Sequence, residues 1–482
     1  MTLAVAPENL TRHAPHPIPG DFEKRRLHLV GVGGCGMSGL AALLLRRGAR
    51  VTGSDARPSA EIARLVERGA AITTQQRAES VPPDAELVVA SAAIPADHPE
   101  LLEARRRGLP VCKYAQMLGA VMARLDGIAI AGTHGKSTTT AWLTFVLRCA
   151  GLDPSFVVGA TVPQLGGGSG DGAGRHFIAE ACEYDRSFLN LRPHRAAILN
   201  IEEDHLDCYK NIAEIRTAFA LFATGVAKGG LVVLNGRDRN CRSIAAGLAA
   251  RVEYFGDEPD CTWRATDATL ERGSYAFTLE HEHRPLGRVH IGLSGRHNVD
   301  NACAVAALAH DCGVSWEQML PGLREFRGAD RRLTLRGDVR GVRVVDDYAH
   351  HPTEIRATLQ AARERFAPRR LWCIFQPHQH SRTRFLLADF ARSFVAADAV
   401  VVPDIYFVRD SQREKDLVRA ADLVRAIRAS GGLASYVPQF ADIVDQLARE
   451  AQPGDVIMTM GAGNIWKVAD ELVERLGADL PA

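Results

Sequence analysis

The sequence predicts an α/β protein with three domains, each built on a mostly parallel sheet. The first observation is the length of 482 residues, which at roughly 150 residues per domain corresponds to about three domains. The second is that three short apolar runs, at residues 27–32, 127–131 and 342–345, each lead into a glycine-rich or polar turn. The third is that strand-like runs alternate with helical patterns, as they do in βαβ units.

We place the limits of the domains near residues 125 and 335, which gives an N-terminal domain at 1–125, a central domain at 126–335 and a C-terminal domain at 336–482. The segments with helical spacing are residues 40–47, 139–150 and 301–310, and further strand-like runs are residues 87–90, 196–200 and 231–235. The glycine-rich stretch 166–174 is expected to be a mobile surface loop of the central domain.

Composition excludes several classes of protein. The chain carries 58 basic and 57 acidic residues, so no bulk charge favours binding to nucleic acid or to an anionic membrane surface. No apolar run is long enough for membrane insertion, and residues 1–20 do not resemble a secretion signal. The ten cysteines are scattered and form no CxxC pair, which disfavours a disulfide framework or a zinc site. We therefore expect a cytoplasmic protein.

The first strand-like run opens a GxGxxG pattern made by Gly31, Gly33, Gly34 and Gly36. Asp55 follows about twenty residues later, after a second strand. Such a turn places a diphosphate at the start of a helix. The pattern is a weak signal, because NAD and a UDP-sugar both carry a diphosphate.

The second run leads into residues 132–138, which have the composition of a phosphate-binding loop. Backbone N–H groups at a helix start favour anions. Lys136 would neutralise the β- and γ-phosphates of ATP, and the Ser137 hydroxyl can ligate Mg²⁺. Ile130 stands where a full GxxxxGK[ST] pattern has its first glycine, so the loop is a shortened one. The alternative is a glycine-rich turn with an exposed lysine. The residues of the loop are Gly132, Thr133, His134, Gly135, Lys136, Ser137 and Thr138.

Acidic side chains follow two further strands of the central domain. Glu180 and Glu183 come after the run 177–179, and an acidic segment at 200–207 contains His205. Carboxylates at strand ends, across a sheet from a phosphate loop, suit a metal ion. The alternative for the second segment is a solvated acidic loop.

Several of these motifs together resemble the Mur ligase family over nearly the whole chain after about residue 25. The matching stretches are GxGGxGMSG at 31–39, GTHGKTT at 132–138 with Ser137 in place of Thr, EADExDxSF at 180–188 with Cys182 in place of Asp, NxExDHxD at 200–207, HNxxN at 297–301, FxGxxRR at 326–332, DDYAHHPTE at 346–354, FQPHQHSRT at 375–383 and GAGxI from 461. The chain departs from the family pattern at residues 113–116 and 407–415.

The resemblance implies a Rossmann-like N-terminal domain, a central domain with a P-loop ATPase-like parallel sheet, and a Rossmann-like C-terminal domain. It also implies that ATP phosphorylates the carboxylate of UDP-N-acetylmuramate and that the amine of L-alanine attacks the acyl phosphate. Residues 215–222 contain no lysine, in keeping with the alanine-adding branch of the family. Both substrates are small molecules, and we expect a monomer or a dimer.

The resemblance assigns roles to individual residues. Lys136, Glu180 and His205 would be catalytic, and Ser137, Glu180 and His205 would hold Mg²⁺. The remaining ATP-binding candidates are Asn298 and Asn301 for adenine, Asp347 for ribose, and Arg331 or Arg332 for the phosphates. The candidates for the amino acid are Tyr348, His350, His378 and Arg382. The UDP-sugar would contact the glycine turn, Met37, Ser38 and Asp55.

Three other functions remain open at this point. A recycling ligase that joins UDP-N-acetylmuramate to a preformed tripeptide shares most of the motifs. An NAD-dependent dehydrogenase would explain the glycine turn but would not need Lys136. A non-catalytic nucleotide-sugar sensor would keep the fold, but it need not keep Lys136, Glu180 and His205 together.

Overall fold

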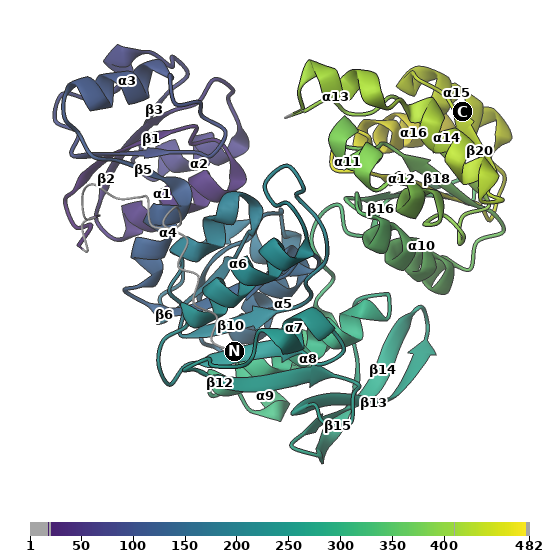
Figure 1. Cartoon of the computed structure of the whole chain (residues 1–482), viewed down its shortest axis with the longest axis horizontal. Coiled ribbons are helices and arrows are strands. Elements are labelled where there is room, and N and C mark those ends of the chain that lie inside the picture. The colour runs from purple at the N-terminus through teal and green to yellow at the C-terminus, as the bar shows by residue number, and fades with distance from the viewer. Residues whose placement is uncertain (1–17, 19–20, 409, 479–482) are drawn as a thin grey trace.

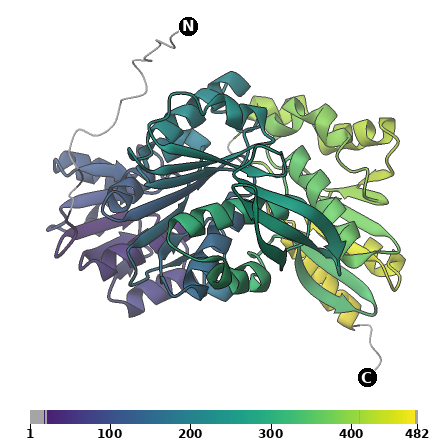
Figure 2. The same cartoon turned by 90° about the horizontal axis from the view of Figure 1, so that it is seen from below.

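The computed structural model describes residues 18, 21–408 and 410–478. Three separate sheets follow one another along the chain. Figures 1 and 2 show the N-terminal domain in purple and the C-terminal domain in yellow-green on opposite sides of the teal central domain. The α/β fold with three mostly parallel sheets is confirmed, whereas the domain limits at 125 and 335 stay predictions. The expectation about a secretion signal concerns residues 1–20, which lie almost entirely outside the described residues.

The N-terminal sheet has five parallel strands in the order β3-β2-β1-β4-β5. This is the Rossmann-like order expected from the sequence. The strands are β1 (Arg26–Val30), β2 (Arg50–Ser54), β3 (Ala71–Thr73), β4 (Leu87–Ala90) and β5 (Val111–Lys113), and the helices are α1 (Cys35–Arg46), α2 (Ala60–Glu67), η1 (Ala78–Ser80), α3 (Pro99–Arg106) and α4 (Tyr114–Met122). Strand β4 is buried along its whole length, because helices cover both faces of the sheet.

The central sheet has ten strands in the order β15-β14-β13-β12-β11-β10-β6-β9-β7-β8. Its strands are β6 (Asp126–Ala131), β7 (Ser155–Val157), β8 (Ser169–Gly170), β9 (His176–Glu180), β10 (Arg195–Ile198), β11 (Leu231–Asn235), β12 (Arg251–Gly256), β13 (Trp263–Glu271), β14 (Ser274–His281) and β15 (Arg284–His290). Its helices are α5 (Lys136–Cys149), η2 (Pro163–Leu165), η3 (Tyr184–Asn190), α6 (Ile212–Thr224), α7 (Arg239–Ser243), α8 (His297–Asp311) and α9 (Trp316–Glu325).

Antiparallel strands extend this parallel sheet at one edge, and the sequence analysis did not foresee them. Strands β13, β14 and β15 form an antiparallel meander. Its turn reaches the C-terminal domain, where the Tyr275 hydroxyl donates a hydrogen bond of 3.1 Å to Glu364 Oε1. Gly273 lies so close to Arg365 that a Cβ atom on Gly273 would be 2.9 Å from the Cα atom of Arg365.

The glycine-rich stretch 166–174 is not the free surface loop that we expected. It contributes β8 to the edge of the central sheet and lies against α1 of the N-terminal domain. A Cβ atom on Gly39 would lie 2.4 Å from Ser169 Cβ, and one on Gly172 would lie 2.0 Å from the carbonyl oxygen of Asp153. Glycine is required here by close backbone approach and not by mobility.

The C-terminal sheet has six strands in the order β16-β17-β21-β18-β19-β20, parallel except for the β16–β17 pair. Its strands are β16 (Thr334–Val339), β17 (Val342–Asp347), β18 (Leu371–Phe375), β19 (Ala399–Val402), β20 (Ala434–Tyr436) and β21 (Val456–Met460). Its helices are α10 (Pro352–Phe366), α11 (His380–Phe385), α12 (Leu387–Ala391), α13 (Gln412–Leu417), α14 (Ala420–Ala429), α15 (Phe440–Glu450) and α16 (Trp466–Ala478). In the connection from the central domain, Arg331 and Leu333 have positive φ angles of 60° and 51°.

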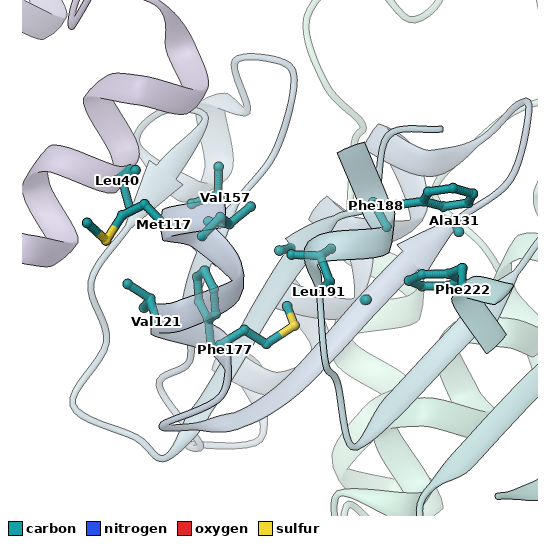
Figure 3. Packing of buried hydrophobic residues seen from close by; sticks show 14 of the residues in the cluster. Leu40, Met117, Val121, Ala131, Val157, Phe177, Phe188, Leu191 and Phe222 are labelled. Atoms are coloured by element: carbon teal, nitrogen blue, oxygen red, sulfur yellow. The ribbon is translucent and has the colours of Figure 1, made fainter. Parts of the chain in front are cut away.

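A single hydrophobic cluster joins the N-terminal and central domains. Figure 3 shows Leu40 of α1 and Met117 of α4 beside Val157 and Phe177 of the central sheet. Met117 and Phe177 have no exposed surface. The C-terminal domain has its own apolar clusters, whose fully buried members all come from residue 333 onward. Across the described residues, no helix is both long and apolar enough to span a bilayer.

Candidate active site

The phosphate-loop candidate joins β6 to α5, as the sequence predicts. Gly132 and Gly135 have φ angles of +144° and +82°, which L side chains rarely adopt. A Cβ atom on Gly132 would also lie 3.0 Å from Leu199 Cβ. The side chain of Asn200 fixes the loop, because its Oδ1 accepts from the His134 backbone N–H at 2.7 Å and its Nδ2 donates to the His134 carbonyl at 3.1 Å.

Lys136 lies at the start of α5 with its side chain 11% exposed and its ammonium group held in place. Nζ donates to the carbonyl oxygens of Gly132 and Thr133 at 2.5 and 3.0 Å and lies 2.9 Å from Glu183 Oε2. Burial alone would lower the pKa of Lys136, but the charge of Glu183 raises it above its ordinary value. The lysine therefore remains a cation inside the site.

Glu183 has a role that the sequence did not predict, since we had named it only as a carboxylate suited to a metal ion. Its side chain is 3% exposed and lies between Lys136 and His205, with Oε1 3.5 Å from His205 Nε2. Burial would raise its pKa, but Lys136 and His205 keep the pKa below its ordinary value. The carboxylate therefore occupies the place beside Lys136 where an anionic ligand would bind.

Ser137 and Glu180 form the second polar pair of the loop. Ser137 Oγ donates to Glu180 Oε2 at 2.9 Å, and the Gly159 backbone N–H donates to the same oxygen at 2.7 Å. Ser137, Glu180 and His205 all line a cavity of about 500 Å³ between the central and C-terminal domains. The structure thus brings the three candidates for magnesium to one wall of one cavity.

A second cavity, of about 260 Å³, lies on the other side of the phosphate loop. Asn298 and Asn301 line it from α8, and Asn301 Nδ2 donates to Asn298 Oδ1 at 3.0 Å. Asp347 lines it from the C-terminal domain and accepts from the backbone N–H groups of Leu333 and Ala349 at 2.7 and 2.8 Å. Burial raises the pKa of Asp347 to about 6.

The two neighbouring arginines have different surroundings. Arg331 Nε donates to Asp346 Oδ2 at 2.8 Å and Nη2 to the Gly461 carbonyl at 2.7 Å, so its guanidinium is used inside the C-terminal domain. Both guanidinium groups lie over the ring of Tyr348, but only Arg332 lines both cavities. Of the pair, Arg332 is the one placed between the two cavities.

His134 bridges the central and C-terminal domains. Its Nδ1 lies 3.2 Å from Glu354 Oε1, and its Nε2 lies 3.6 Å from Glu202 Oε2. Burial would lower the pKa of His134, but the two neighbouring carboxylates, Glu202 and Glu354, raise it to about 9. The reverse effect of His134 lowers the pKa of Glu202 to about 2, against the effect of burial. The Thr353 hydroxyl also crosses the junction, donating to Glu202 Oε2 at 2.7 Å.

Of the four candidates for the amino acid, Tyr348 and His350 line the larger cavity, whereas Arg382 lines a separate small one together with Asp204 and His205. The rings of Tyr348 and His350 are 5.3 Å apart, and those of His350 and His378 are 6.2 Å apart. Burial lowers the pKa of His350 to about 4, which leaves it neutral. Arg382 is already paired, because Nη2 and Nε donate to Asp204 Oδ1 of the central domain at 2.8 and 3.1 Å.

The glycine turn of the N-terminal domain lies on a different sheet from the phosphate loop. The Gly33 backbone N–H donates to Asp55 Oδ2 at 2.8 Å, so Asp55 holds the turn itself. A Cβ atom on Gly36 would lie 2.9 Å from the hydroxyl of Tyr114. Met37 and Ser38 are buried, and their side chains face into the domain.

The two segments that depart from the family pattern have structural contacts. Lys113 precedes α4 and its Nζ lies 3.0 Å from Asp185 Oδ2 of the central domain. In the second segment, where residue 409 lies outside the described residues, Asp410 accepts from the Ser381 hydroxyl at 2.6 Å. Asp410 also accepts from the His380 backbone N–H at the start of α11.

Family comparisons match the chain in three consecutive parts. Residues 26–125 match the Mur ligase family catalytic domain, residues 130–309 match the Mur ligase middle domain, and residues 331–463 match the glutamate ligase domain of Mur ligases.

Individual relatives cover nearly the full chain. A UDP-N-acetylmuramate–L-alanine ligase of Pelotomaculum thermopropionicum is 43% identical over 94% of this chain and 98% of its own length, and one of Caldanaerobacter subterraneus is 41% identical over 94% and 99%. The crystal structure of the UDP-N-acetylmuramate–alanine ligase of Thermotoga maritima superposes with a TM-score of 0.77 at 27% identity, covering 94% of this chain and 100% of that one. A murein peptide ligase of Psychrobacter arcticus gives a TM-score of 0.68 at 27% identity, covering 95% and 100%.

Proposed function

The chain belongs to the Mur ligase family, and from this premise we propose that it joins L-alanine to the carboxylate of UDP-N-acetylmuramate while converting ATP to ADP and phosphate. The observation that carries the proposal is the full-length similarity to relatives named for this reaction. The position of Lys136 supports the proposed reaction independently, because this cation lies at a helix start that faces two cavities between domains.

ATP would occupy the smaller cavity and the phosphate loop. The amides of Asn298 and Asn301 each offer a donor and an acceptor, which suits the edge of adenine. Asp347 would accept from ribose hydroxyls, and Arg332 is positioned to reach the phosphates from between the two cavities. Lys136 would exchange its contact with Glu183 for the β- and γ-phosphates, since both partners are anions.

The reaction then needs positioning more than covalent chemistry from the protein. A carboxylate oxygen of UDP-N-acetylmuramate attacks the γ-phosphorus, and ADP leaves. The neutral amine of L-alanine attacks the carbonyl carbon of the acyl phosphate, loses a proton, and phosphate leaves with the former carboxylate oxygen. Lys136 and the backbone N–H groups at the start of α5 stabilise the charge that develops on the phosphoryl group.

The donor set fits magnesium. Ser137 Oγ and Glu180 Oε2 are already 2.9 Å apart on the cavity wall, and hydroxyl and carboxylate oxygens are ligands that Mg²⁺ prefers. His205 would complete the set from the same wall, beside Glu183. When bound, Mg²⁺ supplies positive charge that offsets the phosphate oxygens.

The amino-acid carboxylate would bind near Arg382, with Tyr348, His350 and His378 enclosing the small side chain. Because Arg382 donates to Asp204 with two nitrogens, the substrate carboxylate must share this guanidinium with Asp204 or displace it. The UDP-sugar would lie at the turn formed by Gly31, Gly33, Gly34 and Gly36, in contact with α1.

The dehydrogenase and sensor alternatives are not supported by the relatives, which are ligases. The tripeptide ligase remains the nearest alternative, because a murein peptide ligase also shares the fold. We further propose that the enzyme works in the cytoplasm, where ATP is available, as a monomer or a dimer.

Phosphate release from ATP tests the proposed reaction. We expect release only when UDP-N-acetylmuramate and L-alanine are both present, with formation of UDP-N-acetylmuramoyl-L-alanine. Faster release with the tripeptide than with L-alanine would overturn the proposal in favour of the recycling ligase.

The glycine turn has its own test. Gly36→Val would push against the Tyr114 hydroxyl and should weaken binding of UDP-N-acetylmuramate, measured by calorimetry. Tighter binding of NAD than of the UDP-sugar to the unmodified protein would contradict the assignment of this turn.

A further inference from the structure

A cluster of metal-ligating side chains lies at the junction of the central and C-terminal domains, apart from the residues assigned to magnesium. His134 comes from the phosphate loop, Glu202 follows β10, and His351 precedes α10. One ligand atom from each residue lies within 4.8 Å of the others. We propose that these three residues bind a divalent transition-metal ion of the zinc and cobalt class.

His134 is oriented as a metal ligand. Its Nδ1 faces Glu354 Oε1 at 3.2 Å, and histidines that bind metals usually donate their other ring N–H to a carboxylate. Its Nε2 is buried, has no hydrogen-bond partner and lies 3.6 Å from Glu202 Oε2. This nitrogen therefore points at the second member of the cluster, and a bound ion would take the place of its proton.

Glu202 is fixed by the opposite domain. The Thr353 hydroxyl donates to Oε2 at 2.7 Å, and the Glu202 backbone N–H donates to the Thr133 hydroxyl at 2.9 Å. Two imidazoles and one carboxylate form a donor set that suits zinc, cobalt or nickel better than magnesium, which prefers oxygen ligands. Charge supports the same conclusion, because Glu354 adds a second carboxylate beside His134.

His351 is the ligand that must give up existing contacts. Its Nε2 lies 3.1 Å from the Glu203 carbonyl oxygen, and its Nδ1 accepts from the Thr353 backbone N–H at 3.3 Å. Ligand atoms around a zinc ion lie roughly 3.3 Å apart for bonds of about 2.0 Å, so the cluster must also contract. Both requirements place this site below a dedicated structural zinc site in affinity.

The position of the cluster determines what a bound ion would do. His134 and Glu202 belong to the central domain, whereas His351 belongs to the C-terminal domain. An ion held by all three links the two domains and favours their closed arrangement. Because His134 and Glu202 also line the smaller cavity, the ion would lie beside the place where nucleotide is proposed to bind.

The test uses Co²⁺ alone as the probe on the full-length protein, in the presence of excess Mg²⁺ and absence of nucleotide. We expect one visible absorption band that saturates at one Co²⁺ per chain and is displaced by Zn²⁺. His134→Gln and His351→Gln, one from each domain, should each weaken Co²⁺ binding by about 10- to 100-fold or more.

The matched controls are His297→Gln and His205→Gln. His297 lines the same cavity but lies outside the cluster, and His205 belongs to the proposed magnesium residues. Both variants should keep the band, and circular dichroism should show that all four variants are folded. Glu202→Gln provides a third ligand variant if either histidine variant fails to fold. The proposal is overturned if no band forms, if the ligand variants keep it, or if His205→Gln abolishes it.

Discussion

The central domain contacts the N-terminal and C-terminal domains through different kinds of side chain. Towards the N-terminal domain the contact has a continuous apolar core that includes Met117 and Phe177, as well as exposed ion pairs such as Lys113–Asp185. Towards the C-terminal domain it is polar, and His134–Glu354 and Arg382–Asp204 span it beside two cavities. Water can replace the partners of a polar contact but cannot replace a buried apolar one. We therefore expect the first junction to stay fixed and the second to open and close.

Because the two junctions differ in this way, a substitution at the apolar junction should change the free energy of unfolding most. Phe177→Ala removes a side chain with no exposed surface and should lower the free energy of unfolding by about 3–5 kcal/mol, measured by urea denaturation. Phe385→Ala is the control, since that side chain is 51% exposed. Equal effects of the two variants would contradict the shared core.

A polar residue beside the second junction should instead affect the reaction. Lys136→Ala removes a charge from the phosphoryl group and should reduce kcat by about 100- to 1000-fold, or about 3–4 kcal/mol. Phosphate release with saturating substrates measures this, and circular dichroism checks the fold. Unchanged turnover in a folded variant would refute the role of the loop.

Arg382→Gln tests whether the polar junction opens before the protein unfolds. Removing one partner of a buried ion pair can cost about 3–5 kcal/mol, but opening would hydrate Asp204 and limit the cost. We expect a larger radius of gyration in small-angle scattering, with a global unfolding free energy within about 1 kcal/mol of the original.

Arg384→Gln is the matched control on the same helix, because Arg384 pairs with Glu414 inside the C-terminal domain. This variant should leave the radius of gyration unchanged. If both arginine variants expand the particle, the Asp204 pair is not what closes the junction.

The smallest expected effect is the response of closure to pH. The pKa of His134 is raised from 6.5 to about 9, so its contribution is complete below pH 6.5 and is lost as pH rises through 9. The pKa of Glu202 is lowered from 4.5 to about 2, so its contribution is complete above pH 4.5 and is lost as pH falls through 2. Closure should therefore be tightest between about pH 4.5 and 6.5.

Small-angle scattering between pH 6 and 9.5 covers the ordinary pKa of His134, 6.5, and its raised value of about 9. The radius of gyration should increase gradually over this range. His134→Gln should remove that expansion, because the variant lacks the imidazole whose charge is lost over this range. A constant radius of gyration in the unmodified protein would show that His134 does not contribute to closure.

Sequence reasoning found the features that depend on neighbours along the chain. The strand-to-helix turns at Gly33 and Gly135 are local patterns, so their positions could be predicted. The pairing of Glu183 with Lys136, and of Asp204 with Arg382, depends on how separate segments pack, and no local pattern encodes it. The prediction for the stretch 166–174 was wrong for the same reason, because Gly172 and Gly174 pack closely against the backbone at Asp153.

The connection between the central and C-terminal sheets contains two residues with strained backbone conformations. Arg331 and Leu333 adopt left-handed backbone conformations, which cost a non-glycine residue about 1–3 kcal/mol each. Both residues are held in this conformation from within the C-terminal domain, because the Leu333 backbone N–H donates to Asp347 Oδ2 at 2.7 Å and the Arg331 carbonyl oxygen accepts from the Tyr348 backbone N–H at 2.7 Å. The preceding residue, Asp330, instead donates its backbone N–H to the Thr161 carbonyl oxygen of the central domain at 2.8 Å. The chain therefore passes from one domain to the other between residues 330 and 331, so a change in the angle between the domains would leave these two conformations in place.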